Sequence, residues 1–109
     1  MSQAVQHDPD GNQFVISVDG EAVGKAEYLD VDGRRIFFHT KVDPSQSGKG
    51  LAGELVSTAL DETVSQGMRI VPVCPYVAKH TQRHDTWSDH VDPVTDAVKE
   101  LIKSSSRTT

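Results

Sequence analysis

Hydrophobic and polar positions alternate in the first half of the chain and then change to a helical spacing. Residues 14–18 (FVISV) alternate and are rich in β-branched side chains, which predicts a strand. Residues 19–20 (DG) form a tight-turn dipeptide, so residues 22–29 are expected to pair back as a second strand. Residues 32–33 (DG) repeat the signal and lead into a third predicted strand over residues 34–42. The expected result is an antiparallel meander.

From residue 51 onward the apolar positions recur every three or four residues, which predicts a helix with one face on the sheet. Gly67 stops this pattern at a position where a left-handed cap is common. Residues 69–74 (RIVPVC) are predicted to form a fourth strand, parallel to the third because a helix intervenes. Pro72 cannot donate a ladder hydrogen bond, so one side of this strand is expected to be unpaired. The apolar helix positions are Leu51, Ala52, Leu55, Val56, Ala59, Leu60 and Val64.

The last third of the chain is expected to be helical. Pro75 suits the first position of a helix over residues 76–84. Asp92, followed by a proline, is expected to cap a last helix. Its apolar face is predicted to consist of Val94, Ala97, Val98, Leu101 and Ile102. Residues 1–12 and 104–109 are expected to be disordered, and residues 1–109 to form one α/β (α+β) domain.

Composition narrows the classes of partner. The formal net charge of −5 argues against nucleic-acid binding, which needs an excess of Lys and Arg. The chain has one cysteine, so an internal disulfide cannot form. No apolar run approaches the roughly 20 residues that span a bilayer, and the start of the chain has no secretory h-region. We therefore expect a cytoplasmic protein, monomeric or weakly dimeric, that does not associate with membranes.

Three glycines, Gly48, Gly50 and Gly53, stand between the third predicted strand and the helix. Glycines let the backbone approach an anion, the first N–H groups of a helix point at it, and Lys49 adds a charge. Residues 48–53 (GKGLAG) also match the dinucleotide-binding pattern G-x-G-x-x-G. Residues 43–47 separate them from the preceding strand, which argues against a dinucleotide-binding fold. A phosphate-binding turn is the favoured interpretation, and a simple helix-entry turn is the alternative.

Residues 42–55 (VDPSQSGKGLAGEL) resemble the acetyl-CoA loop of the GNAT acetyltransferase superfamily. In that pattern an Arg or Gln is followed after two residues by Gly, and then after one residue by Gly or Ala. The Gly falls on Gly50 and the small residue on Ala52, whereas Ser47 stands at the Arg or Gln position. The likeness extends over residues 14–91 to the short, single-domain YjdJ-type branch. It is carried further by Glu27-Tyr28, His39-Thr40, Cys74-Pro75-Tyr76-Val77 and Arg83-His84.

This resemblance implies a minimal GNAT-like fold with acetyl-CoA as co-substrate and no metal. The pyrophosphate would be held mainly by backbone amides, and pantetheine would lie between two splayed strands, which also accounts for Pro72. The expected cofactor-binding residues are Val42, Ser47, Gly48, Lys49, Gly50, Leu51, Ala52, Gly53 and Arg83.

Five residues are candidates for catalysis. Cys74 precedes a predicted helix, where a thiol gains thiolate character, so it is expected beside the thioester or as a small buried side chain. His80 stands where related sequences carry a tyrosine that protonates the departing thiolate, and Tyr76 is the substitute donor. His39 and Glu27 lie on neighbouring predicted strands, where they would accept the amine proton or form an ordinary polar pair.

The expected function is transfer of an acetyl group from CoA to an unidentified amine. A non-catalytic acetyl-CoA-binding module is the alternative, because a chain this short leaves the acceptor site open. A metal-binding protein is a third possibility, since His80 and His84 have i, i+4 spacing near Cys74. No second cysteine and no HExxH context support it, so no metal is expected.

Overall fold

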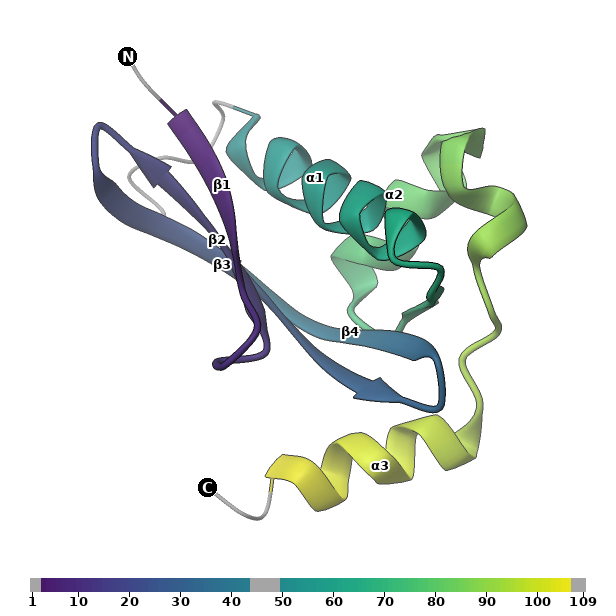
Figure 1. Ribbon diagram of the computed structural model, residues 1–109. Helices are drawn as coiled ribbons and strands as arrows, with labels where there is room; N and C mark the ends of the chain where they lie inside the picture. Colours follow the sequence, from purple (N-terminus) through teal and green to yellow (C-terminus); the bar gives the residue numbers. More distant parts are fainter. Residues whose placement is uncertain (1–2, 44–49, 107–109) are drawn as a thin grey trace.

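The computed structural model describes residues 3–43 and 50–106, which form a sheet with helices on both faces (Figure 1). The strands are β1 (Gln3–Asp8), β2 (Gln13–Val18), β3 (Glu21–Val31), β4 (Arg34–Val42) and β5 (Arg69–Pro72). The helices are α1 (Leu51–Ser65), α2 (Pro75–Arg83), the 3-10 helix η2 (Asp85–His90) and α3 (Asp96–Ser106). Helices α1 and α2 lie over one face of the sheet, and α3 lies below the other. The expected α+β class is confirmed.

The predicted meander and both of its turns are present. Strands β2, β3 and β4 pair antiparallel in chain order. Asp19 and Gly20 have φ of 53° and 86°, and Asp32 and Gly33 have φ of 51° and 76°. Two consecutive left-handed residues are what a two-residue type I′ hairpin turn requires, which is why the Asp-Gly pairs mark these turns in the sequence.

The crossover through α1 is also confirmed, because β4 and β5 pair in parallel. Their ladder runs from Arg34 opposite Arg69 to Phe37 opposite Pro72, and β5 ends there. β5 is the edge strand of the sheet, in the order β1-β2-β3-β4-β5. β4 continues to Val42 without this partner.

Disorder at the start of the chain is a wrong expectation, since residues 3–8 form β1 on the edge next to β2. Val5 packs against the core, and the His7 ring stacks on Phe14 with the ring centres 4.3 Å apart. The Gly11 N–H donates to the Asp8 side chain at 3.2 Å and so fixes the turn into β2. Only alternate residues of this short strand face the core, and a polar edge strand has little apolar pattern.

The start of the last helix is a second correction. Asp92 does not cap it: its carboxylate accepts from Arg69 Nε at 2.8 Å, and its N–H donates to the Ile70 carbonyl at 2.7 Å. The residue that caps α3 is Thr95, whose hydroxyl accepts from the Val98 N–H at 3.3 Å. Asp92 therefore belongs to the edge of the sheet.

Helix α3 packs on the sheet with fewer residues than the five of its predicted apolar face. Val98 is buried against Ile36 and Val71, and Ile102 packs partly on the same cluster. The other members of the predicted face are exposed, namely Val94, Ala97 and Leu101. The helix extends to Ser106, so residues 104–106 are helical rather than disordered.

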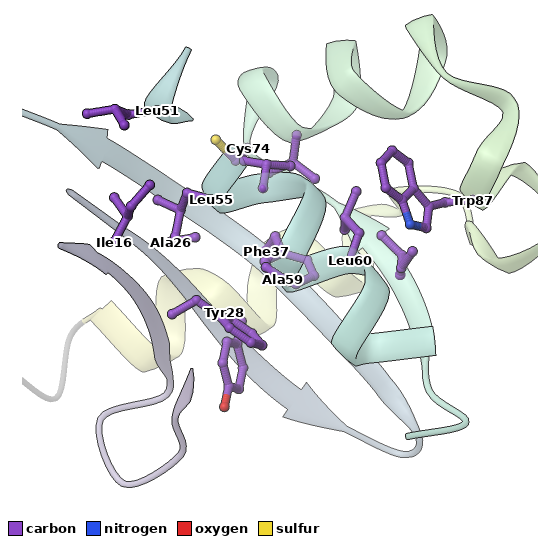
Figure 2. Close-up of a cluster of buried hydrophobic side chains, with 14 of the residues drawn as sticks. Ile16, Ala26, Tyr28, Phe37, Leu51, Leu55, Ala59, Leu60, Cys74 and Trp87 are labelled. Atoms are coloured by element: carbon purple, nitrogen blue, oxygen red, sulfur yellow. The ribbon is translucent and has the colours of Figure 1, made fainter. Parts of the chain in front are cut away.

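The main core fills the space between the sheet and α1 (Figure 2). The stripe predicted for the helix supplies Leu51, Leu55, Val56, Ala59 and Leu60, all buried. Ala52 and Val64 are half-buried at its border. No helix in residues 3–43 and 50–106 has the length and apolarity to cross a membrane.

One buried cation lies at the edge of this core. Arg35 is 3% exposed, and its Nε and Nη2 donate to the two carboxylate oxygens of Asp30 at 2.9 and 3.0 Å. Its guanidinium carbon lies 4.3 Å from the centre of the Tyr28 ring. Within the described residues its Nη1 has no hydrogen-bond partner. Asp30 is therefore the group that neutralises this charge.

Replacing Asp30 by Ala should lower the free energy of unfolding by about 2 kcal/mol, because a buried guanidinium is left unpaired. Urea denaturation measures the change. The double variant Asp30→Ala/Arg35→Met should recover most of the loss, since the charge is removed together with its partner. Glu100→Ala breaks the exposed 3.8 Å pair with Lys103 and should change stability by less than about 0.5 kcal/mol. Equal losses of stability in Asp30→Ala and Glu100→Ala would contradict the assignment of Asp30 as the group that neutralises Arg35.

Candidate functional site

The N-terminus of α1 is open in the manner that anion binding requires. Gly50 precedes the helix with φ of 72°, and no side chain of the described residues caps the first turn. Its carbonyl accepts from the Glu54 N–H at 3.1 Å, so the first helical N–H groups, from Leu51 to Gly53, have no partner within the helix. A methyl group built on Gly50 would meet no atom of the non-adjacent described residues within 4 Å. Backbone donors and free space thus coincide at this turn.

Cys74 lies where β4 and β5 part. Its N–H donates to the Phe37 carbonyl at 2.8 Å, one step beyond the last ladder pair. Its thiol points at Thr40, with Sγ 3.5 Å from the Thr40 Oγ1 atom. The side chain is 6% exposed and borders the core at the end where Leu51 begins α1 (Figure 2). Cys74 is also the N-cap of α2.

The free edge of β4 begins next to a bulge. Glu27 is opposite His39 and Tyr28 is opposite Phe37, so Phe38 is the extra residue on β4. Beyond Phe37, no described strand pairs with β4 on the side of β5. This edge runs past Thr40 to Val42, which packs against the core. The backbone groups of an unpaired strand edge can bind an extended chain as a further strand would.

Helix α2 brings two of the candidate residues to α1. A methyl group added at Gly53 would lie 3.8 Å from the Tyr76 hydroxyl oxygen and 3.9 Å from His80 Cε1. The Tyr76 and His80 rings are nearly parallel, at 20°, with their centres 6.2 Å apart. Tyr76 is 42% exposed. Its hydroxyl group therefore lies beside the first turn of α1 and is accessible to a ligand there.

His80 has a different environment. Its Nε2 lies 2.9 Å from Ser57 Oγ on α1, and its ring centre lies 5.3 Å from that of Trp87. Burial lowers the pKa of His80, and the charges of His84 and Arg83 lower it further. The lowered pKa favours the uncharged imidazole at neutral pH, so the ring is less available as a proton donor than an unperturbed histidine. This disfavours the expectation that His80 protonates the leaving thiolate.

Glu27 and His39 are neighbours, as expected, but they lie on the other face of the sheet. Thr40 pairs with the buried Ala26 on the face toward α1, and the adjacent pair of His39 and Glu27 faces away from α1. Glu27 forms an ion pair with Lys25 at 3.1 Å. The sheet therefore separates Glu27 and His39 from Cys74, and the free edge of β4 is the route between the two sides.

The remaining expected residues separate into two groups. Ser47, Gly48 and Lys49 lie outside the described residues. Arg83 is exposed at the far end of α2 from Cys74, beyond His80. No contact between Arg83 and the turn at Gly50 is found among the described residues, and its role in cofactor binding stays a prediction. Among residues 3–43 and 50–106, no three His, Cys, Asp or Glu side chains gather as a metal site would require.

Two partners were missed by sequence reasoning. Thr40 contacts Cys74, and Ser57 contacts His80, across 34 and 23 residues of chain. The alternation of residues 39–42 along β4 could have placed Thr40 and Val42 on one face. Nothing local in the sequence pairs Ser57 with His80.

The family model described as GCN5-related N-acetyl-transferase matches residues 13–90. This segment runs from β2 to the end of η2 and contains every candidate residue above. No significant match is found among curated proteins.

Solved structures share the fold at low identity. A GCN5-like protein from Staphylococcus aureus has a TM-score of 0.64 at 18% identity, covering 85% of this chain and 91% of that one. A GCN5-related N-acetyltransferase from Ralstonia eutropha JMP134 has a TM-score of 0.54 at 18% identity, covering 81% and 64%. The Escherichia coli ribosomal-protein-S18-alanine N-acetyltransferase has 0.51 at 24% identity, but only 53% of this chain and 38% of that enzyme align. These likenesses confirm the expected fold.

The environment of His80 makes stability depend on pH. Since the pKa of His80 is lower folded than unfolded (about 6.5), the unfolded state takes up the proton first as pH falls. The contribution of neutral His80 to the free energy of unfolding is therefore complete above about pH 6.5, and it is lost as the pH drops below the unfolded-state pKa. We expect the urea midpoint of unfolding to fall between pH 7 and pH 5, and to fall less in His80→Gln. Glutamine keeps an N–H for Ser57 without a titrating group.

His7 titrates in the same direction, because burial lowers its pKa as well, so the wild type and His80→Gln must be compared at both pH values. The pKa of His80 itself can be followed by NMR of the imidazole protons. Identical pH dependence in the two proteins, or a His80 pKa above 6.5, would contradict this description.

Proposed function

The chain belongs to the GCN5-related N-acetyltransferase family, and we propose that it binds acetyl-CoA and transfers its acetyl group to an amine. We place it in the short YjdJ-type branch, on the strength of its Cys-Pro-Tyr-Val segment at residues 74–77. The observation that carries the proposal is the end of the β4–β5 ladder at Phe37 and Pro72. The side chain of Cys74 lies at this opening, and Leu51, the first residue of α1 after the turn at Gly50, belongs to the same buried cluster as Cys74.

The residues present fit the parts of this co-substrate. The N–H groups after Gly50, which have no partner within the helix, suit the pyrophosphate because they carry the positive end of the helix dipole. The free edge of β4 suits pantetheine, whose amides can hydrogen-bond to backbone as a strand would. Acetyl-CoA supplies an activated thioester, and Cys74 and Thr40 would line the place where it ends.

The transfer needs two proton movements. The neutral amine bonds to the acetyl carbonyl carbon, the C–S bond breaks, and the amine proton passes to His39 or Glu27. Tyr76 gives its hydroxyl proton to the departing thiolate, because it is exposed beside the first turn of α1. His80 positions Tyr76 by ring contact rather than donating a proton itself. Cys74 shapes the thioester site, and attack by the amine is direct.

Gly50→Ala should abolish or strongly weaken acetyl-CoA binding in calorimetry, because a side chain would stand where phosphate approaches the backbone. The matched control is Gly67→Ala at the other end of α1. Gly67 has φ of 74° and equally open surroundings, so both variants carry the same left-handed strain of about 1–2 kcal/mol. Affinity lost equally in both, or in neither, would place the cofactor elsewhere.

Acetyl-CoA should protect Cys74 from alkylation by iodoacetamide. The chain has one cysteine, so mass spectrometry reports on this thiol alone. Protection is expected in the wild type and not in Gly50→Ala, where the cofactor no longer binds. Equal rates of alkylation with and without bound acetyl-CoA would contradict the placement of Cys74 beside the thioester. Turnover with a panel of amines then separates a transferase from a binding module.

A further inference from the structure

The face of the sheet away from α1 is divided into an apolar and a polar half. Helix α3 covers the apolar half through Val98, which packs on Ile36 and Val71. The polar half is floored by two cross-strand rows of β2, β3 and β4. One row is Gln13, Glu27 and His39, and the next is Val15, Lys25 and Lys41.

A pocket of about 520 Å³ lies over the second row, a volume typical of small-molecule sites. Its walls include Gln13, Val15, Gly24, Lys25, Lys41 and Asp43. No residue of α3 lines it. The pocket is therefore on the open half of the sheet and on the same face as His39 and Glu27, which do not line it.

The charges at the floor of this pocket favour an anion. Lys25 and Lys41 are directly opposite each other on β3 and β4. Like charges in this arrangement destabilise a sheet unless a counter-charge lies between them. Glu27 compensates Lys25 at 3.1 Å, but Lys41 forms no ion pair with any residue that the structure describes. Lys41 is thus available to a carboxylate in the pocket.

The first row supplies the complementary chemistry. Glu27 and His39 can hold an amine and accept its proton, and they lie two residues along the strands from the lysine row. Two strand residues span roughly 6.6 Å. His39 also lies on β4 beside its free edge, across which an amine would reach the thioester.

Building on the function proposed above, we infer that this pocket binds the acetyl acceptor, and that the acceptor carries both an amine and a carboxylate. The two groups are separated by about one strand repeat, as in an ω-amino acid of about five carbons. The carboxylate lies in the pocket over Lys25 and Lys41. The amine extends past Gln13, which lines the pocket, to Glu27 and His39 in the next row.

The test uses 5-aminopentanoate and pentylamine, which share the amine and the chain length and differ in the carboxylate. In NMR titrations without acetyl-CoA, 5-aminopentanoate should shift the amides of Val15, Lys25 and Lys41. Pentylamine should bind about tenfold more weakly, since the hydrogen bonds to charged groups are missing. Lys41→Gln should weaken 5-aminopentanoate binding by a similar factor and leave pentylamine unchanged. Lys103→Gln, on the exposed side of α3, is the matched control and should change neither.

Equal affinity for the two compounds, or unaltered binding in Lys41→Gln, would overturn the inference. Acetyl-CoA calorimetry is independent of these titrations. Suppose that acetyl-CoA does not bind in calorimetry but 5-aminopentanoate still binds in a Lys41-dependent way. The acetyltransferase proposal would then be refuted, and the assignment of the pocket as a 5-aminopentanoate site would stand. At saturating acetyl-CoA, kcat/KM for the amine should be higher with 5-aminopentanoate than with pentylamine. Lys41→Gln should remove this difference.

Discussion

Pro72 has no N–H to donate, and β5 ends at this residue after pairing with β4 as far as Phe37. The opening between β4 and β5 at the candidate site follows from that early end. The chain turns at Cys74, which makes one backbone bond to Phe37 and then starts α2 with Pro75. β4 continues alone to Val42 and keeps one edge unpaired by the described strands. Had β5 run the full length of β4, the edge would be covered and α2 would begin farther from Gly53.

The bulge at Phe38 matters as much as the end of the ladder. An extra residue in a strand changes which side chains face each side of the sheet beyond it. Because of it, Thr40 lies with Ala26 on the side of α1, while His39 and Lys41 lie on the opposite side. One strand thus presents a contact to Cys74 on one face and charged, proton-accepting groups on the other. A reaction between two substrates on opposite sides of a strand edge needs this distribution.

Local signals in the sequence were sufficient for much of this architecture. The Asp-Gly pairs require left-handed backbone, the stripe of α1 has helical period, and Pro75 begins α2. The turn at Gly50 was identified because three glycines before an amphipathic helix exceed what a helix start needs. β1 was missed, since only Val5 and His7 of its residues face the core. Asp92 was assigned to the wrong element because its partner, Arg69, is distant in sequence.

The catalytic side chains were harder for the same reason. A histidine in a helical segment shows its spacing in the sequence but not its burial. Burial and the charges of His84 and Arg83 lower the pKa of His80. Its ring lies 5.3 Å from that of Trp87, and its Nε2 lies 2.9 Å from Ser57 on another helix. Only the packing of α1, α2 and η2 together shows that the pKa of His80 is lowered, and that Tyr76, one turn earlier, is the more exposed of the two side chains.

The overall charge of the chain constrains how an anionic co-substrate can be held. With a net charge of −5, the protein as a whole repels a polyphosphate at long range. That repulsion is screened beyond about 8 Å at physiological ionic strength, so affinity has to arise at short range. Backbone N–H groups at the first turn of α1 act at hydrogen-bond distance and do not alter the net charge. They also keep their positive potential at every pH, unlike a histidine. A helix start with a left-handed glycine therefore reconciles an acidic protein with an anionic ligand, and it leaves Lys41 free for the other substrate.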